Sequence, residues 1–280
     1  MSIDGQTRVV GIIGDPVQHS LSPQMHNAAF KHLKLNFVYI PFHVKPEEVG
    51  EAIRGMKALG VVGLNVTVPH KIEVMKYLDE ITQDAAAIGA VNTICVKGNG
   101  LVGDNTDGQG FVRSLVEDEG VTIASKNVVI LGSGGSARAI GYALLKEGAS
   151  RLIFCNRTVS RAEEMARSFQ SQGVFVAGMG VIDGADEITR ADILINTTSA
   201  GMKQGDPLLI DPMWIRAGQV VYDIIYSPPE TPLLQAAKAR GARAINGLGM
   251  LIHQGALAFE IWTGCSAPVE VMRNVFSFPS

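Results

Sequence analysis

Cysteine is scarce in this sequence. Its 280 residues include three cysteines, Cys95, Cys155 and Cys265, which lie far apart and belong to no CxxC pair or cysteine–histidine cluster. Disulfide-stapled scaffolds and structural zinc sites need cysteines that are numerous or closely spaced. We therefore expect neither a disulfide scaffold nor a structural zinc site, and no bound metal. The low cysteine content also indicates a reducing compartment, the cytoplasm.

Long runs of one charge and long apolar runs are absent as well. The net charge is −3 and the charged residues, 18% of the chain, are well mixed, so nothing indicates a nucleic-acid partner or an anionic membrane. Residues 1–16 place acidic and polar side chains before a short apolar run, which is typical of neither a signal peptide nor a membrane span. A hydrophobic content of 46% indicates a folded protein, and 280 residues are enough for two domains.

Short apolar runs alternate with longer amphipathic stretches, a pattern typical of βαβ units around a mainly parallel sheet. The apolar runs predict strands at 9–14, 36–44, 61–68, 90–96, 127–132, 151–156, 191–198 and 219–226. The amphipathic stretches predict helices at 22–33, 46–57, 108–119, from the glycine loop to 147, and at 160–170, 232–241, 247–264 and 268–276. Ser22, just before Pro23, is expected to cap the first helix.

A glycine loop follows the strand at 127–132. The pattern Gly132-x-Gly134-x-x-Ala137 fits the dinucleotide-binding fingerprint, in which the first glycine permits a tight turn and the second lets backbone N–H groups approach a pyrophosphate. The small Ala137 allows close packing of helix on strand. The missing Gly-Lys-Ser/Thr argues against a nucleotide triphosphatase, while a strand–helix turn without a ligand remains the alternative.

The end of the next strand indicates which dinucleotide binds. An NAD site usually has an acidic residue there, but this chain has Asn156, Arg157 and Thr158, with Arg161 one turn later. The planar fork of arginine suits a 2′-phosphate, so NADP is favoured over NAD. The alternative is that both arginines are solvated charges on a helix face.

The first third of the chain gathers small polar residues in its turns. Hydroxyls and amides at strand ends suit a ligand that carries a carboxylate and several hydroxyls. Each residue alone also has a structural interpretation: Lys71 as a surface lysine, Asp107 as a helix cap, and His19, His26 and His70 as ordinary turn or helix histidines.

Several ordered segments together resemble the shikimate dehydrogenase family. They are GDPVQHSLSPQMHN (14–27), NVTVPHK (65–71), GAVNT (89–93), DNTDGQG (104–110), GSGGSARA (132–139), NRTVSRAEEMA (156–166) and GLGMLIHQGALAFEIWTG (247–264). The resemblance covers nearly the whole chain. It implies an α/β protein with a substrate-binding domain (1–106), an inserted Rossmann-like NADP domain (107–241), and C-terminal helices (242–280) that return to the substrate domain.

The resemblance also implies an activity, the reversible NADPH-dependent reduction of 3-dehydroshikimate to shikimate in chorismate and aromatic amino acid biosynthesis. Lys71 and Asp107 would be the acid/base and polarising pair at the ring C3 carbonyl. Whether Lys71 transfers the proton or chiefly binds and polarises stays open. The substrate would be bound by Ser20, Ser22, Asn65, Thr67, Asn92, Tyr226 and Gln254, and the cofactor by Gly132, Gly134, Gly135, Ser136, Asn156, Arg157, Thr158, Arg161, Ile224, Gly247 and Met250.

Other functions fit parts of the same pattern. The chain could oxidise quinate with broader cofactor use, act on an aminated shikimate analogue, or be a non-catalytic NADP-binding regulator on the same fold. Retention of both Lys71 and Asp107 argues against the regulator, since a sensor needs no proton donor. Monomer and homodimer are both compatible with the sequence.

Overall fold

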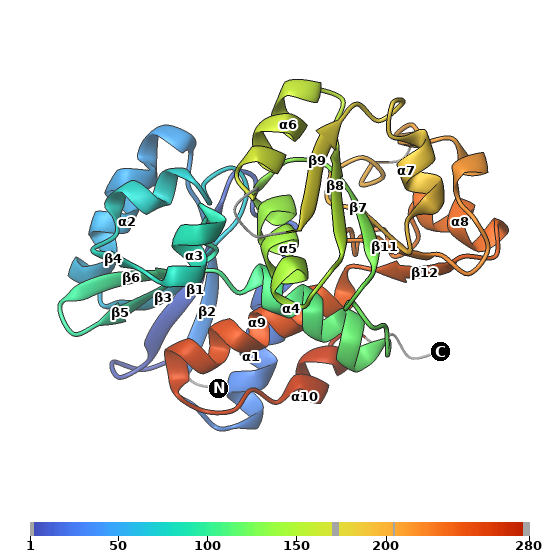
Figure 1. The fold of residues 1–280 in the computed structure, drawn as a ribbon. Coiled ribbons are helices and arrows are strands. Elements are labelled where there is room, and N and C mark those ends of the chain that lie inside the picture. The colour runs from blue at the N-terminus through green and yellow to red at the C-terminus, as the bar shows by residue number, and fades with distance from the viewer. Residues whose placement is uncertain (1–2, 170–173, 204, 277–280) are drawn as a thin grey trace. The chain divides into compact units, whose positions relative to one another are not determined.

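The computed structural model describes residues 3–169, 174–203 and 205–276. The chain forms two compact units (Figure 1). The first runs from the N-terminus to Gly110 and takes up the chain again from Ile252, and the second is Phe111–Leu251. Each unit is built around its own six-stranded sheet, which confirms the predicted α/β class with two domains.

The sheet of the first unit has the strand order β2-β1-β3-β5-β6-β4. Its strands are β1 (Arg8–Gly14), β2 (Phe37–His43), β3 (Val61–Val66), β4 (Glu80–Ile81), β5 (Thr93–Lys97) and β6 (Gly100–Asp104). The central strand β1 is parallel to β2 and β3, whereas β5 is antiparallel to both of its neighbours. The end of β3 therefore meets the beginning of β5 and the end of β6 at one edge of the sheet.

Helices of the first unit surround this sheet, some packed on its strands and some on other helices. They are α1 (Ser22–His32), η1 (Pro46–Glu48), α2 (Val49–Ala58), η2 (Glu73–Tyr77), α3 (Gln83–Ile88) and α10 (Val269–Asn274), together with most of α9 (Leu248–Thr263). The expectation that Ser22 caps α1 is wrong. Leu21 precedes the helix with helical backbone angles, and no side chain caps it, because Ser22 is already the first helical residue. Its hydroxyl is thus not used as a cap.

The sheet of the second unit is entirely parallel, in the order β12-β11-β10-β7-β8-β9. Its strands are β7 (Asn127–Leu131), β8 (Arg151–Cys155), β9 (Phe175–Met179), β10 (Ile193–Asn196), β11 (Val220–Asp223) and β12 (Arg243–Asn246). Because both faces of a parallel sheet are covered, β7, β8 and β10 are almost wholly apolar and buried. The order reverses beside β7, the strand that precedes the glycine loop.

The helical segments around this sheet are α4 (Asp107–Arg113), a π-helical turn η3 (Ser114–Asp118), α5 (Gly135–Lys146), α6 (Val159–Arg167), α7 (Ala185–Arg190), η5 (Pro212–Trp214) and α8 (Pro232–Ala239). The predicted helix at 160–170 corresponds to α6, and Gln170 at its predicted end lies outside the described residues. No helix in the described ranges is long and apolar enough to cross a membrane.

The boundaries between the two observed units differ from the expected domain boundaries. Residues 242–251 were expected to return to the substrate domain, but β12 pairs in parallel with β11, and Met250 is buried in the second core. At the other crossing, α4 begins in the first unit while Phe111 is fully buried in the second core. Both changes of unit therefore fall within helices, α4 and α9, instead of in loops.

Candidate active site

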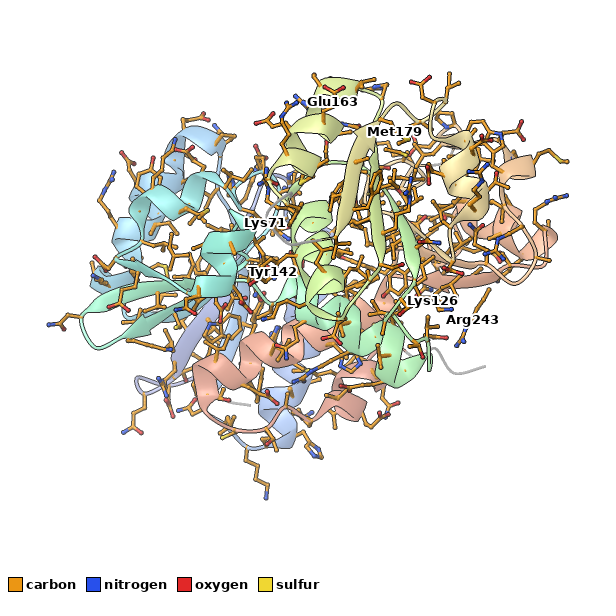
Figure 2. All side chains as sticks on the ribbon, viewed as in Figure 1. Lys71, Lys126, Tyr142, Glu163, Met179 and Arg243 are labelled. Atoms are coloured by element: carbon orange, nitrogen blue, oxygen red, sulfur yellow. The ribbon has the colours of Figure 1, made fainter. Side chains whose placement is uncertain are left out.

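An ion pair between Lys71 and Asp107 is the chemical centre of the first unit. The Lys71 ammonium lies 2.5 Å from Asp107 Oδ2, and the two side chains are only 14% and 7% exposed. The Asn92 amide donates a hydrogen bond to the other carboxylate oxygen, Oδ1, at 2.7 Å. Lys71, labelled in Figure 2, comes from the segment after β3, and Asp107 opens α4. Both carboxylate oxygens are thus held, and the ammonium is fixed at one place.

The backbone around Lys71 is tied to the sheet. Its carbonyl accepts the Val91 N–H at 2.8 Å, and the Thr67 N–H donates to the Ile13 carbonyl at 2.9 Å. These bonds extend the pairing of β3 with β1 on one side. On the other side they connect the segment after β3 to the residues just before β5. Hydrogen bonds to the sheet therefore fix the position of the segment that carries Lys71.

Two buried amides form a network beside the ion pair. Asn92 Oδ1 accepts the Thr106 N–H at 2.8 Å. The Asn65 amide donates to Thr93 Oγ1 at 3.2 Å and to the Asn92 carbonyl at 3.3 Å. Asn65 Oδ1 accepts from the Tyr39 hydroxyl at 2.8 Å. Because both amide hydrogens of Asn65 already have acceptors, this residue offers a ligand chiefly its Oδ1 lone pair.

The three predicted carboxylate-binding hydroxyls lie after neighbouring strands. Ser20 and Ser22 follow β1 at the start of α1, and Thr67 follows β3. Ser20 Oγ accepts the Ser22 N–H at 3.3 Å, and Ser22 is buried. Because β1 and β3 are adjacent and parallel, the hydroxyls project from one edge of the sheet.

Gln254 belongs to the same unit through α9. A Cβ atom placed on Gly110 of α4 would lie 2.6 Å from the Gln254 backbone nitrogen, so α4 and α9 touch at this point. Gly110 is one helical turn beyond Asp107. The helix that begins with the catalytic candidate Asp107 therefore also sets the position of Gln254.

Two buried histidines of the first unit contact other residues of the fold. His70 is 1% exposed and its Nε2 bonds the Val44 carbonyl at 2.7 Å. His26 is fully buried, and its ring stacks on Tyr39 with 4.4 Å between the ring centres. The interpretation of both as ordinary histidines of the fold agrees with this geometry.

The glycine loop of the second unit has the predicted backbone. Gly132 has a φ of +113°, and a Cβ atom there would lie 2.5 Å from Thr197 Oγ1, so only glycine fits. Gly134 is exposed, with no atom within 4 Å of where its Cβ would be, and Gly135 begins α5. Ala137 is completely buried in the core. The residues present fit a pyrophosphate, because backbone N–H groups at the start of α5 are open to a ligand.

The basic segment follows β8, the strand next to β7. Asn156 is half-buried, while Arg157, Thr158 and Arg161 are exposed at the start of α6. In the described part of the chain neither arginine is in an ion pair with a carboxylate. Donors without a competing acid suit the 2′-phosphate of NADP.

The remaining predicted cofactor residues lie near the ends of β11 and β12. Ile224 and Tyr226 follow β11, Gly247 follows β12, and Met250 is buried in the first turn of α9. Tyr226 is in the second unit, unlike the other predicted substrate-binding residues.

Sequence reasoning missed Asp223, the last residue of β11. Its fully buried carboxylate accepts hydrogen bonds from Asn196 at 3.0 Å, from the Ile225 N–H at 3.1 Å and from the Thr231 hydroxyl at 2.7 Å. Burial raises the pKa of Asp223, and the three donors oppose that shift. Asp223 thereby orders the segment that carries Ile224 and Tyr226. An acidic residue inside the apolar run at 219–226 was the available signal.

Fold and site define a class of protein. A parallel sheet with a glycine loop and a basic segment, joined to an α/β unit that holds a buried lysine–aspartate pair, is the arrangement of a two-domain dinucleotide-dependent oxidoreductase. Three family models match the chain: the shikimate dehydrogenase substrate binding domain at residues 12–94, shikimate / quinate 5-dehydrogenase at 114–204, and the shikimate 5'-dehydrogenase C-terminal domain at 247–275. The chain belongs to the shikimate dehydrogenase family, as the sequence motifs predicted.

Relatives and solved structures agree with this membership. The shikimate dehydrogenase (NADP(+)) of Methanopyrus kandleri is 49% identical over 98% of this chain and 96% of its own length. A crystal structure of a shikimate dehydrogenase in complex with NADP+ has a TM-score of 0.91 and 47% identity, covering 98% of this chain and 96% of that one. The shikimate 5-dehydrogenase of Listeria monocytogenes, crystallised with shikimate and NAD, has a TM-score of 0.91 and 36% identity over 99% of both chains.

Proposed function

We propose that this protein is an NADP-dependent shikimate dehydrogenase that interconverts 3-dehydroshikimate and shikimate. The observation that carries the proposal is the buried Lys71–Asp107 pair, whose second carboxylate oxygen is held by Asn92. The names of its relatives support the same activity and the same cofactor.

The Lys71 ammonium acts on the oxygen of the reacting carbonyl. When bound, NADPH supplies the hydride to the ring C3 carbon. Negative charge then grows on the oxygen, and a fixed cation beside it lowers the barrier because the charge is stabilised where it develops. A proton must also reach this oxygen to complete the alcohol, and the Lys71 ammonium is a group that can donate it. Asp107 holds the ammonium in place and balances its charge.

The other polar groups of the first unit bind and orient the ring. Ser20, Ser22 and Thr67 donate their hydroxyl protons to the substrate carboxylate. Asn92 and Gln254 contact ring hydroxyls, and Asn65 accepts from one through Oδ1. Tyr226, from the second unit, is assigned to the carboxylate as well.

The second unit binds the cofactor along the ends of its strands. Gly132, Gly134, Gly135 and Ser136 hold the pyrophosphate at the start of α5. Asn156, Arg157, Thr158 and Arg161 bind the adenosine 2′-phosphate, which gives the preference for NADP. Ile224, Gly247 and Met250 flank the nicotinamide and its ribose.

The role of Lys71 is tested by replacing it. Removal of a well-placed donor typically lowers turnover by about 10²–10³-fold, and we expect a loss at least that large in Lys71→Ala with little change in fold. Lys76→Ala is the matched control, because Lys76 lies five residues on, has a 67% exposed side chain and forms an ion pair with Glu73 on the surface. Near-normal turnover in purified Lys71→Ala contradicts the assignment.

A further inference from the structure

A short hydrogen bond links the glycine loop to the basic segment. Asn156 Nδ2 donates to Ser133 Oγ at 2.6 Å. The register of the sheet explains the contact: Leu131 is paired with Cys155, so the residues just after each strand emerge side by side at the carboxyl edge. Both side chains are half-buried. The two cofactor-binding segments are therefore joined by a hydrogen bond between their own side chains.

This bond leaves two hydrogen-bond donors unused. Ser133 Oγ is the acceptor, so the serine hydroxyl proton is still available to be donated. The second amide hydrogen of Asn156 likewise has no partner among the described residues. The pair therefore offers one O–H donor and one N–H donor in a fixed arrangement. Both donors lie at the half-buried carboxyl edge of the sheet, next to Arg157 and Thr158.

The positive charge at this edge of the sheet favours an anionic ligand group. Arg157 and Arg161 are exposed and, within the described ranges, not paired with any carboxylate. A phosphate monoester is dianionic near neutral pH and has only acceptor oxygens, so it matches two neutral donors flanked by two cations. A ribose 2′-hydroxyl has one proton to donate and gains less from such a set.

We propose that Ser133 is a specificity-determining residue for the cofactor: it fixes the Asn156 amide and, together with it, donates to the adenosine 2′-phosphate. The inference rests on the proposed NADP-dependent function and deepens it. Ser133 stands inside the glycine loop, but its side chain serves the 2′-phosphate and not the pyrophosphate. Loss of the hydroxyl removes one donor and releases the amide from its fixed rotamer.

Two nucleotides that differ only in the 2′-phosphate test this assignment without turnover. Calorimetry on the full chain measures the binding of 2′,5′-ADP and 5′-AMP to the wild type and to Ser133→Ala. Because a hydrogen bond to a charged group is strong, we expect 2′,5′-ADP to bind about tenfold more weakly to the variant, and 5′-AMP to bind unchanged. Ser133→Thr keeps a hydroxyl and should retain most of the affinity.

Two further serines make the comparison sharp. Ser168→Ala loses a hydrogen bond of 2.7 Å at the far end of α6 and should leave both affinities unchanged. Ser136→Ala should weaken the binding of both nucleotides alike, since Ser136 is assigned to the phosphate they share.

A double variant tests the link between Ser133 and Asn156. Combining Ser133→Ala with Asn156→Ala should lower the affinity for 2′,5′-ADP by less than the sum of the two separate losses, because the residues act as a unit.

The outcomes distinguish the role of Ser133 from the NADP dependence of the protein. Equal loss of 2′,5′-ADP and 5′-AMP in Ser133→Ala, or no loss of either, overturns the role of Ser133. A wild type that binds the two nucleotides alike contradicts the NADP assignment itself. Thermal unfolding of each variant shows that the comparison is made on folded protein.

Discussion

At the scale of single residues, His26 is buried and uncharged in the middle of an aromatic cluster. Its ring is parallel to that of Tyr39 within 2°, and Trp262 and Phe30 surround it. Burial lowers the pKa of His26 to about 3. The Tyr39 hydroxyl in turn bonds Asn65 in the candidate site. His26 therefore supports a site residue through packing, as a neutral ring.

A buried neutral histidine makes stability depend on pH. The ordinary histidine pKa is 6.5 and that of folded His26 is about 3, so between these values the unfolded chain binds a proton that the folded protein does not. Stability is full above about pH 6.5 and is lost as the pH falls toward 3, at up to about 1.4 kcal/mol per pH unit. His26→Phe keeps an aromatic ring and should remove this contribution.

Urea unfolding at pH 7 and pH 5 measures the effect. The loss of stability between the two should be smaller in His26→Phe than in the wild type by roughly 2 kcal/mol. His32→Phe is the control, because this histidine is exposed on the same helix. The same pH dependence in His26→Phe as in the wild type would show that His26 is not a neutral buried group.

Sequence motifs predicted the candidate site residues but not their partners. Lys71 and Asp107 follow from the family resemblance, yet nothing in the sequence alone says that Asn92 holds the second carboxylate oxygen. Ser133 and Tyr39 were missed because their importance lies in one side-chain bond each, to Asn156 and Asn65. Such bonds depend on strand register, which is set by tertiary packing.

At the scale of elements, the contact of α4 with α9 joins two parts of the candidate site. A Cβ atom on Gly110 would lie 2.6–2.9 Å from atoms of Gln254, mostly backbone. Such contacts cannot be relieved by a side-chain rotation, so a methyl group there must push the helices apart. Gln254 would move with α9, while Asp107 stays at the start of α4.

Gly110→Ala should therefore damage substrate binding. Overpacking of this kind costs roughly 1–3 kcal/mol, so we expect kcat/KM for shikimate to fall about tenfold or more while the affinity for NADP+ stays unchanged. Gly55→Ala in α2 is a matched control, because its nearest neighbour is 4.0 Å away and alanine favours a helix. Unchanged shikimate kinetics in Gly110→Ala would show that this contact does not set Gln254.

Elements with clear apolar runs were predicted well, and short ones were missed. The strands β1, β3, β7 and β8 correspond to predicted runs. The strands β4, β6, β9 and β12 were not predicted, because β4 has only two residues and the apolar residues of the other three are interrupted or flanked by glycine or polar residues. Their strand character comes from pairing with a neighbour in the sheet, which a local pattern does not reveal.

At the scale of the whole molecule, the alternation of strands and helices was enough to predict two α/β domains. The position of the second change between units could not be predicted from the sequence. The strand β12 is short and lies between two helices, so its sequence resembles a connecting loop. The order of the strands also had to come from the structure, since sequence order and sheet order differ in both units. Function at this scale follows from the family, to which both units belong.

The proposed activity pairs one substrate, shikimate, with one cofactor, NADP. The most direct test is the initial rate of reduced-nicotinamide formation with shikimate or quinate, each combined with NADP+ or NAD+. We predict that kcat/KM for shikimate with NADP+ exceeds that of every other combination by about tenfold or more, and the preference for NADP+ arises because the donors around Arg157 favour a 2′-phosphate. Equal or faster turnover with quinate or with NAD+ would contradict the specificity, and no turnover with any combination would contradict the function.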